Sequence, residues 1–209
     1  MINIELKKYI ESKVLPMYKN NEQGHGDKHI EYVVRRSLEF AKQVNDVNLD
    51  IVYTVACYHD IGHHIDAKNH EKVSADMFME DDNIKSFFTP EQAIIIFEAI
   101  QDHRASGDGD PRSIYGKIVS SADRRTDLND IMRTMYTYRL KHSPEYTIQE
   151  NIEDAYSHIS RKFAYGGYGT TKMYFKDEEY NKLIEQAEYF KPHKDEFIKY
   201  YCDINKIDI

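Results

Sequence analysis

Residues 54–64 read Thr54-Val55-Ala56-Cys57-Tyr58-His59-Asp60-Ile61-Gly62-His63-His64. This stretch is an apolar helical segment that ends in an adjacent histidine and aspartate, followed by a glycine and two more histidines. An imidazole beside a carboxylate suits a divalent metal, because one supplies a neutral nitrogen and the other a charged oxygen that can bridge two ions. A simpler explanation exists for His59 alone, since a histidine is favourable near the negative end of a helix dipole. The metal interpretation therefore needs support from the rest of the chain.

The overall composition excludes several classes of protein. The 209 residues carry a net charge of −8 and lack the basic stripe of a general nucleic-acid binder. They contain no apolar run of about 18 residues, so we expect no membrane-spanning helix. The N-terminus lacks the continuous apolar core of a signal peptide, and the two cysteines lie in separate helical patterns. We therefore expect a cytoplasmic protein without a membrane or nucleic-acid partner.

Apolar residues recur at helical spacing along the chain, and the sequence shows no convincing alternation of strand residues. The clearest helix start is Thr89-Pro90-Glu91-Gln92, which combines an N-cap, a proline at the first helical position and a capping-box glutamine. Asp27 suits the N-cap of another helix, and Gly62 stops the helix expected over 48–59. Further helical patterns cover 3–19 with an interruption near Pro16, 129–141, 147–163, and 177–203 with a break at Pro192. The sequence predicts an all-α protein.

Several polar residues fall on the buried sides of these helices, at or near the helix ends. They are His29, His59, Asp60, His70, His103 and Asp123. Taken singly, a partly buried, hydrogen-bonded histidine is the more frequent explanation for a residue such as His29. Taken together, several buried imidazoles and carboxylates without partners would cost roughly a few kcal/mol each. A shared metal centre removes that cost. Nitrogen and carboxylate ligands without thiolates suit manganese, iron, cobalt, nickel or zinc more than calcium.

The order His29, His59-Asp60, Asp123 resembles the signature of the HD superfamily of metal-dependent phosphohydrolases, which consists of a histidine, a His-Asp doublet and a distant aspartate. The neighbouring residues agree, because Ile61-Gly62 follows the doublet and Ala122 and Arg124 flank the aspartate. The resemblance covers residues 25–127 and implies an HD-domain-like helical bundle. Residues 128–209 would then be a helical extension. We expect residues 1–209 to form a single helical domain with its metal-binding core over 25–127.

The resemblance also implies a set of metal ligands. His29, His59, Asp60 and Asp123 would hold one divalent ion. His70 and His103 lie where two-metal members of the superfamily carry extra histidines, so they would hold a second ion with Asp60 as the bridge. One alternative stays open at this point, in which a single ion is bound and His70 and His103 are ordinary polar residues at helix ends.

Three further residues are candidates for contacts to a substrate. His63 could contact a phosphate or move a proton, although a solvated loop histidine is the alternative. Arg104 and Arg124 directly follow proposed ligands and could bind phosphate oxygens, and Arg124 could instead pair with a ligand carboxylate. His25 and His64 are interpreted as neighbours of ligands without a required role.

The resemblance implies a metal-dependent phosphohydrolase or phosphodiesterase that acts on a nucleotide or another small phosphate ester through a metal-bound hydroxide. Asp60 and His63 would be its catalytic residues. Two alternatives remain. A few relatives use a similar site to hold two irons and activate oxygen, which would make the protein a di-iron oxygenase. The site could also sense a nucleotide without turnover, as a non-catalytic binding module.

Overall fold

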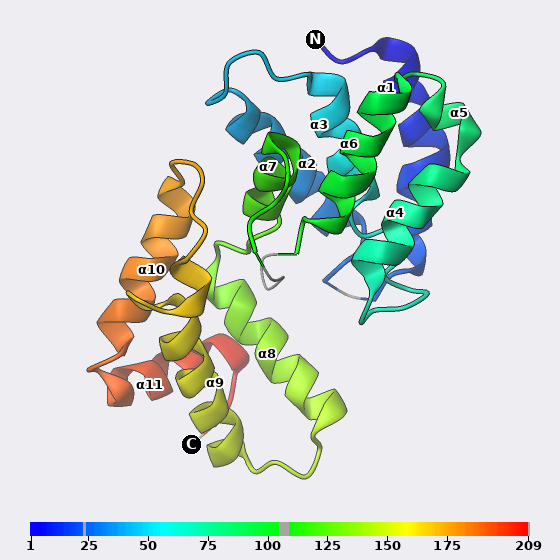
Figure 1. Ribbon diagram of the computed structural model, residues 1–209. Coiled ribbons are helices and arrows are strands. Elements are labelled where there is room, and N and C mark those ends of the chain that lie inside the picture. Colours follow the sequence, from blue (N-terminus) through cyan, green and yellow to red (C-terminus); the bar gives the residue numbers. More distant parts are fainter. Residues whose placement is uncertain (23, 105–108, 209) are drawn as a thin grey trace. The chain divides into compact units, whose positions relative to one another are not determined.

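The computed structural model describes residues 1–22, 24–104 and 109–208. Helices and turns make up these ranges, which contain no strand, so the all-α prediction is confirmed (Figure 1). The chain divides into two compact units, Met1–Arg124 and Arg125–Ile209. The single domain expected from the sequence, with its core over 25–127, stays a prediction. Among the described residues, no helix has both the length and the apolar character needed to cross a membrane.

The first unit contains residues 54–64, with the His59-Asp60 pair. Its helices in chain order are α1 (Ile4–Tyr9), η1 (Ile10–Val14), η2 (Leu15–Asn20), α2 (Asp27–Ala41), α3 (Leu49–Tyr58), α4 (His70–Glu80), α5 (Asp82–Lys85), α6 (Pro90–Gln101) and α7 (Ile114–Ala122). The expected N-terminal helix over 3–19 is therefore three consecutive pieces. Pro16 lies in the first turn of the 3-10 helix η2, where its missing N–H removes no helical hydrogen bond.

Helix α3 is the centre of this unit, and all of its residues from Ile51 to Tyr58 are buried. Asn48 caps its N-terminus by accepting a hydrogen bond from the Asp50 N–H. Helices α2, α6 and α7 each pack against α3, and α4 packs on α6 (Figure 1). Burial on every side explains why α3 is apolar all round. The same packing places the end of α3 beside the ends of its neighbours.

The helix starts follow the predicted capping chemistry with one exception. Thr89 and Gln92 form both hydrogen bonds of a capping box at the start of α6. Asp27 was expected to be the N-cap of α2, but Gly26 occupies that position and Asp27 is the first helical residue. A carboxylate is also favourable in the first turn, because it lies near the positive end of the helix dipole.

The second unit is a separate helical cluster with its own core. It contains α8 (Leu128–His142), α9 (Ile148–Phe163), η3 (Tyr168–Thr170), α10 (Glu178–Phe190) and α11 (Lys194–Asn205). These helices match the expected patterns, and the break between α10 and α11 falls at Pro192 as predicted. Large apolar side chains such as Phe163, Leu183 and Phe197 fill the core.

Candidate metal centre

Six polar side chains from five helix ends converge in the first unit. His29 is the third residue of α2, His59 and Asp60 follow α3, His70 begins α4, His103 follows α6, and Asp123 follows α7. The convergence follows from the packing around α3, because the neighbouring helices bury their apolar faces against one another and end close together.

Asp60 lies between the two halves of this cluster. Its side chain is buried, with Oδ2 3.5 Å from both His29 Nε2 and His59 Nε2. Its other oxygen, Oδ1, lies 3.1 Å from His70 Nε2 and 3.5 Å from His103 Nε2. The two oxygens of one carboxylate therefore face two different pairs of imidazoles.

The first group consists of His29, His59 and Asp123, which offer one ligand atom each within 4.8 Å of one another. His29 Nε2 lies 3.1 Å from His59 Nε2 and 3.2 Å from Asp123 Oδ1. The distance between His59 Nε2 and Asp123 Oδ1 is 3.7 Å. These separations match those between neighbouring ligands that each lie about 2.0–2.2 Å from one ion.

The second group consists of Asp60, His70 and His103, whose ligand atoms also lie within 4.8 Å of one another. His70 Nε2 and His103 Nε2 are 3.2 Å apart, and both face Asp60 Oδ1. All three residues are buried. The structure therefore brings the six predicted ligands together as two sets that share Asp60.

The backbone determines which nitrogen of three histidines faces Asp60. His59 Nδ1 lies 2.8 Å from the carbonyl oxygen of Ala56, and His103 Nδ1 lies 2.7 Å from that of Ile100. His70 repeats the pattern, with its Nδ1 3.0 Å from the carbonyl oxygen three residues earlier. A carbonyl oxygen only accepts, so each Nδ1 carries the proton and donates it. The Nε2 lone pairs are left to face the carboxylates, which is the arrangement of a metal-binding imidazole.

Proton affinity differs within each histidine pair. Burial lowers the pKa of His59 to about 4. Burial also acts to lower the pKa of His29, but hydrogen bonds to Asp123 and Asp60 outweigh it and raise that pKa to about 9. In the second group, burial lowers the pKa of His70, whereas the carboxylate of Asp60 outweighs burial and raises that of His103. His29 in the first group and His103 in the second thus have the higher proton affinity of each pair, and a metal ion would compete with a proton there.

The residues present fit divalent metals. Asp60 Oδ1 is buried, and within the described residues it accepts no hydrogen bond, although two imidazole nitrogens face it. A buried carboxylate oxygen without a hydrogen bond is costly unless a cation balances it. Neutral nitrogens and carboxylate oxygens without thiolates form a donor set for manganese, iron, cobalt, nickel or zinc.

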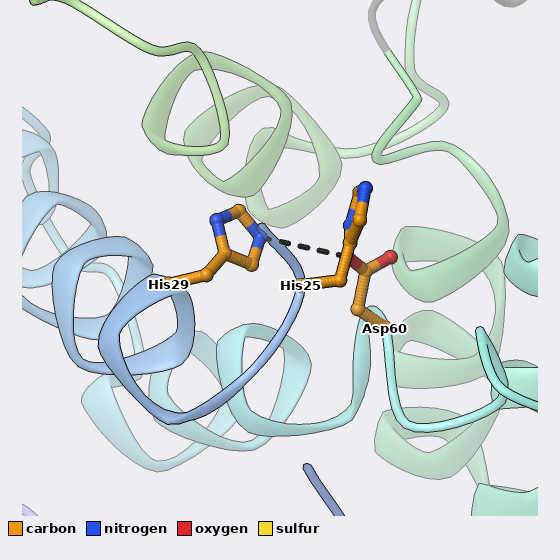
Figure 2. Close-up of side chains that lie close together, drawn as sticks. All are labelled: His25, His29 and Asp60. Carbon is orange, nitrogen blue, oxygen red and sulfur yellow. Dashed lines mark hydrogen bonds and ion pairs between the residues drawn. The ribbon is translucent and has the colours of Figure 1, made fainter. Parts of the chain in front are cut away.

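His25 is a site residue that the sequence analysis set aside. Its Nδ1 lies 2.6 Å from Asp60 Oδ2, and it forms a third potential metal-binding group with His29 and Asp60. Figure 2 shows the side chains of His25 and His29 directed at the carboxylate of Asp60. His25 precedes α2 and belongs to no apolar pattern, so only its position four residues before His29 could have drawn attention to it.

His63 lies beside the cluster. Its ring stacks on that of His25, with centroids 3.9 Å apart and an angle of 16° between the ring planes. Burial lowers the pKa of His63, and its Nδ1 is buried without a hydrogen-bond partner among the described residues. His64 instead turns to Asn21, whose Oδ1 lies 3.2 Å from His64 Nδ1.

The two arginines have identifiable structural contacts. Arg104 donates from its guanidinium to the carbonyl oxygen of Lys68 at 2.8 Å and pairs with Glu71 at 3.5 Å. Arg104 therefore stabilises the start of α4, beside His70. The carbonyl oxygen of Arg124 accepts a hydrogen bond from the Tyr32 hydroxyl at 3.0 Å, which ties the end of α7 to α2.

Comparisons with known proteins identify the family of the domain that contains these residues. The model of the HD domain family matches residues 26–127. Residues 26–127 belong to the HD domain family. The resemblance to the HD superfamily that the sequence predicted is therefore confirmed. HD domains bind divalent metals, and all six predicted ligands lie within the matched range.

One solved structure is similar over nearly the whole chain. It is described as a predicted HD superfamily hydrolase from an uncultured Thermotogales bacterium, and its sequence is 19% identical. The alignment covers 95% of this chain and 90% of that one, with a TM-score of 0.50. At this identity the likeness concerns the fold. A search of curated proteins finds no match.

Proposed function

We propose that this protein is a metal-dependent phosphohydrolase that acts on a nucleotide or another small phosphate ester. The HD domain supports a metal-dependent hydrolase in general. The observation that carries the proposal is the division of the Asp60 carboxylate, whose Oδ1 faces His70 and His103 while Oδ2 faces His29 and His59. A carboxylate shared in this way suits two neighbouring cations, and paired divalent ions are suited to phosphate oxygens.

Bound divalent ions would supply charge to neutralise phosphate oxygens and would lower the pKa of water at neutral pH. The protein's own part is to hold the ligands in place. His59, His70 and His103 are fixed by hydrogen bonds to backbone carbonyls, so their Nε2 atoms are oriented before any ion arrives. Orientation of this kind lowers the cost of assembling the site.

The cysteines do not offer an alternative nucleophile. Cys57 and Cys202 are both buried, and burial raises the pKa of both thiols. A buried thiol with a raised pKa is a poor nucleophile, because the thiolate is the reactive form. This supports a mechanism in which metal ions activate the attacking group.

We propose His63, Arg104 and Arg124 as contacts for the substrate. His63 supports this role by lying against His25 beside Asp60, with its Nδ1 without a hydrogen-bond partner among the described residues. Arg104 is partly exposed, with a side-chain exposure of 41%, and its contacts with Lys68 and Glu71 engage one of its guanidinium nitrogens. The other donors of its planar group could bind phosphate oxygens.

The proposal is tested by assaying release of phosphate from a panel of nucleotides and simple phosphate esters, with each of manganese, iron, cobalt, nickel and zinc in turn. We expect turnover with at least one metal and loss of turnover in Asp60→Asn. Tight metal binding without turnover of any phosphate ester would contradict the proposal. A mixed-valence signal from an iron pair in electron spin resonance would instead favour a di-iron oxygenase. Nucleotide binding without turnover would favour a binding module.

A further inference from the structure

Asn21 is not one of the proposed metal ligands, but its side chain makes several hydrogen bonds near Asp60. Its side-chain Nδ2 donates to the carbonyl oxygens of both His25 and Asp60, each at 2.9 Å. Its Oδ1 accepts from the backbone N–H of His64 at 3.1 Å. One amide thus uses both of its N–H donors and its oxygen to join Asn21 to the turn that carries Asp60.

His25 continues this connection to the carboxylate itself. The carbonyl oxygen of His25 is held by Asn21, and its ring Nδ1 lies 2.6 Å from Asp60 Oδ2. The ring is supported on one face by His63, which stacks on it. Asn21 therefore fixes the backbone of His25, and His25 contacts the side chain of Asp60.

Asp60 needs such support because it lies outside a regular helix. Helix α3 ends at Tyr58, and Asp60 lies in the turn that follows. Its backbone N–H donates to the hydroxyl of Tyr18 at 3.3 Å, and its carbonyl oxygen accepts from Asn21. The N–H, the carbonyl oxygen and Oδ2 are thus each held by a residue that precedes α2. Oδ1 is left to face the second group.

We propose that Asn21 and His25 are positioning residues that set the direction of the Asp60 carboxylate, so that each oxygen meets its own pair of imidazoles. This inference rests on the proposed function only in treating Asp60 as a metal ligand. A rotation of the carboxylate would move Oδ1 and Oδ2 together. An oxygen displaced from one pair of imidazoles would therefore leave the other oxygen displaced from its pair as well. Loss of either positioning residue should therefore weaken the binding of both ions.

The test is a calorimetric titration of the metal-free protein, residues 1–209, with manganese, combined with thermal melts. Asn21→Ala removes all the amide contacts, and Asn21→Asp keeps an acceptor for His64 but loses both donors. His25→Ala removes the contact with Oδ2. In His25→Asn, the amide nitrogen can occupy the place of Nδ1 and still donate, but it is a much weaker metal ligand than imidazole. We expect about 10- to 100-fold weaker binding in the first three variants. His25→Asn should bind within about threefold of the unmodified protein.

Asn48→Ala is the matched control. Asn48 lies at the other end of α3 and caps it through the Asp50 N–H. Its loss should lower the melting temperature without changing manganese affinity, so a general loss of stability can be told from a loss of positioning. Equal weakening in Asn48→Ala would overturn the proposal.

The Asn21 and His25 variants also test the two positioning roles separately. Unchanged affinity in both Asn21 variants would overturn the role of Asn21. Binding in His25→Asn as weak as in His25→Ala, with one ion fewer, would show that His25 is itself a ligand and would overturn its positioning role. Failure of the unmodified protein to bind manganese, iron, cobalt, nickel or zinc, each titrated in the same way, would overturn this proposal together with the proposed function. Binding without phosphate release would contradict only the proposed function.

Discussion

His70 Nε2 lies 3.1 Å from Asp60 Oδ1, a buried oxygen that accepts no hydrogen bond within the described part of the chain. The same carboxylate contacts the first group through Oδ2. One aspartate thus links helices α2 and α3 to α4 and α6.

The first prediction separates the two groups by their metal content. Replacing His70 or His103 with alanine should lower the manganese content by about one ion per chain and leave the first ion bound, because both residues belong to the second group and face Asp60 through Oδ1. Elemental analysis after dialysis measures this. An unchanged metal count in both variants would return them to the role of ordinary helix-end residues.

The second prediction concerns the shared carboxylate. Asp60→Asn keeps the shape of the side chain but removes its charge, so both ions should bind more weakly and turnover should fall by at least about 100-fold. Asp123→Asn is the comparison, because among the described residues Asp123 forms a potential metal-binding group with His29 and His59, and its loss should leave the second ion in place. Titration calorimetry with phosphate release measures both effects. Equal loss of both ions in Asp123→Asn would contradict the assignment of Asp60 as the only shared ligand.

The third prediction concerns Gly62, which allows the turn after Asp60 to approach α4. A Cβ atom at Gly62 would lie 2.7 Å from Val73 Cγ1 and 2.9 Å from the backbone nitrogen of Ser74. The N–H of Gly62 also donates to the Ser74 hydroxyl at 3.0 Å. Gly62→Ala should therefore lower the free energy of unfolding by about 1–3 kcal/mol and weaken the second ion, since α4 begins with His70.

Chemical denaturation with and without manganese measures both parts of that prediction. Asn48→Ala is the control, because it removes the cap at the other end of α3 and should lower stability without lowering the metal content. A Gly62→Ala protein as stable as the parent, with full metal content, would show that the turn and α4 can separate without consequence.

The fourth prediction concerns pH. The pKa of His29 is raised to about 9 in the metal-free protein, so His29 is protonated at pH 7 and must lose that proton to bind a metal. Binding of the first ion should release about one proton at pH 7 and about half a proton at pH 9, where half of the His29 side chains have already lost the proton. Calorimetry in two buffers of different ionisation enthalpy gives the number of protons. If no proton is released at pH 7, or if proton release increases towards pH 9, His29 is not the residue that loses a proton to the metal.

The fifth prediction concerns metal removal. The proposed ions would bind the folded first unit and not the unfolded chain, so each ion at about 100 times its Kd should stabilise that unit by about 2.7 kcal/mol. For a chain of this size the corresponding shift is about 5–10 °C in melting temperature. A chelator should reverse the shift, and differential scanning calorimetry measures it. Identical melting with metal and with chelator would argue that the cluster is held by protons alone.

The sequence by itself determined the helices and the side of each helix on which polar residues lie. Caps at Asn48 and Thr89 and the apolar period are local features, because a helix forms from hydrogen bonds and side chains within a few residues. For the same reason the fold class and the resemblance to the HD superfamily could be predicted.

Only the tertiary structure decided how these polar residues combine. His29 meets Asp123, and His70 meets His103, although helical period says nothing about which helix ends lie side by side. That choice follows from the packing of apolar faces around α3, which acts over long sequence separations. It also decided which oxygen of Asp60 faces each pair. The sequence gives no sign of the contacts of Asn21 and His25 with Asp60, because both residues precede α2 in non-helical chain, where no periodicity marks a side chain as directed inward.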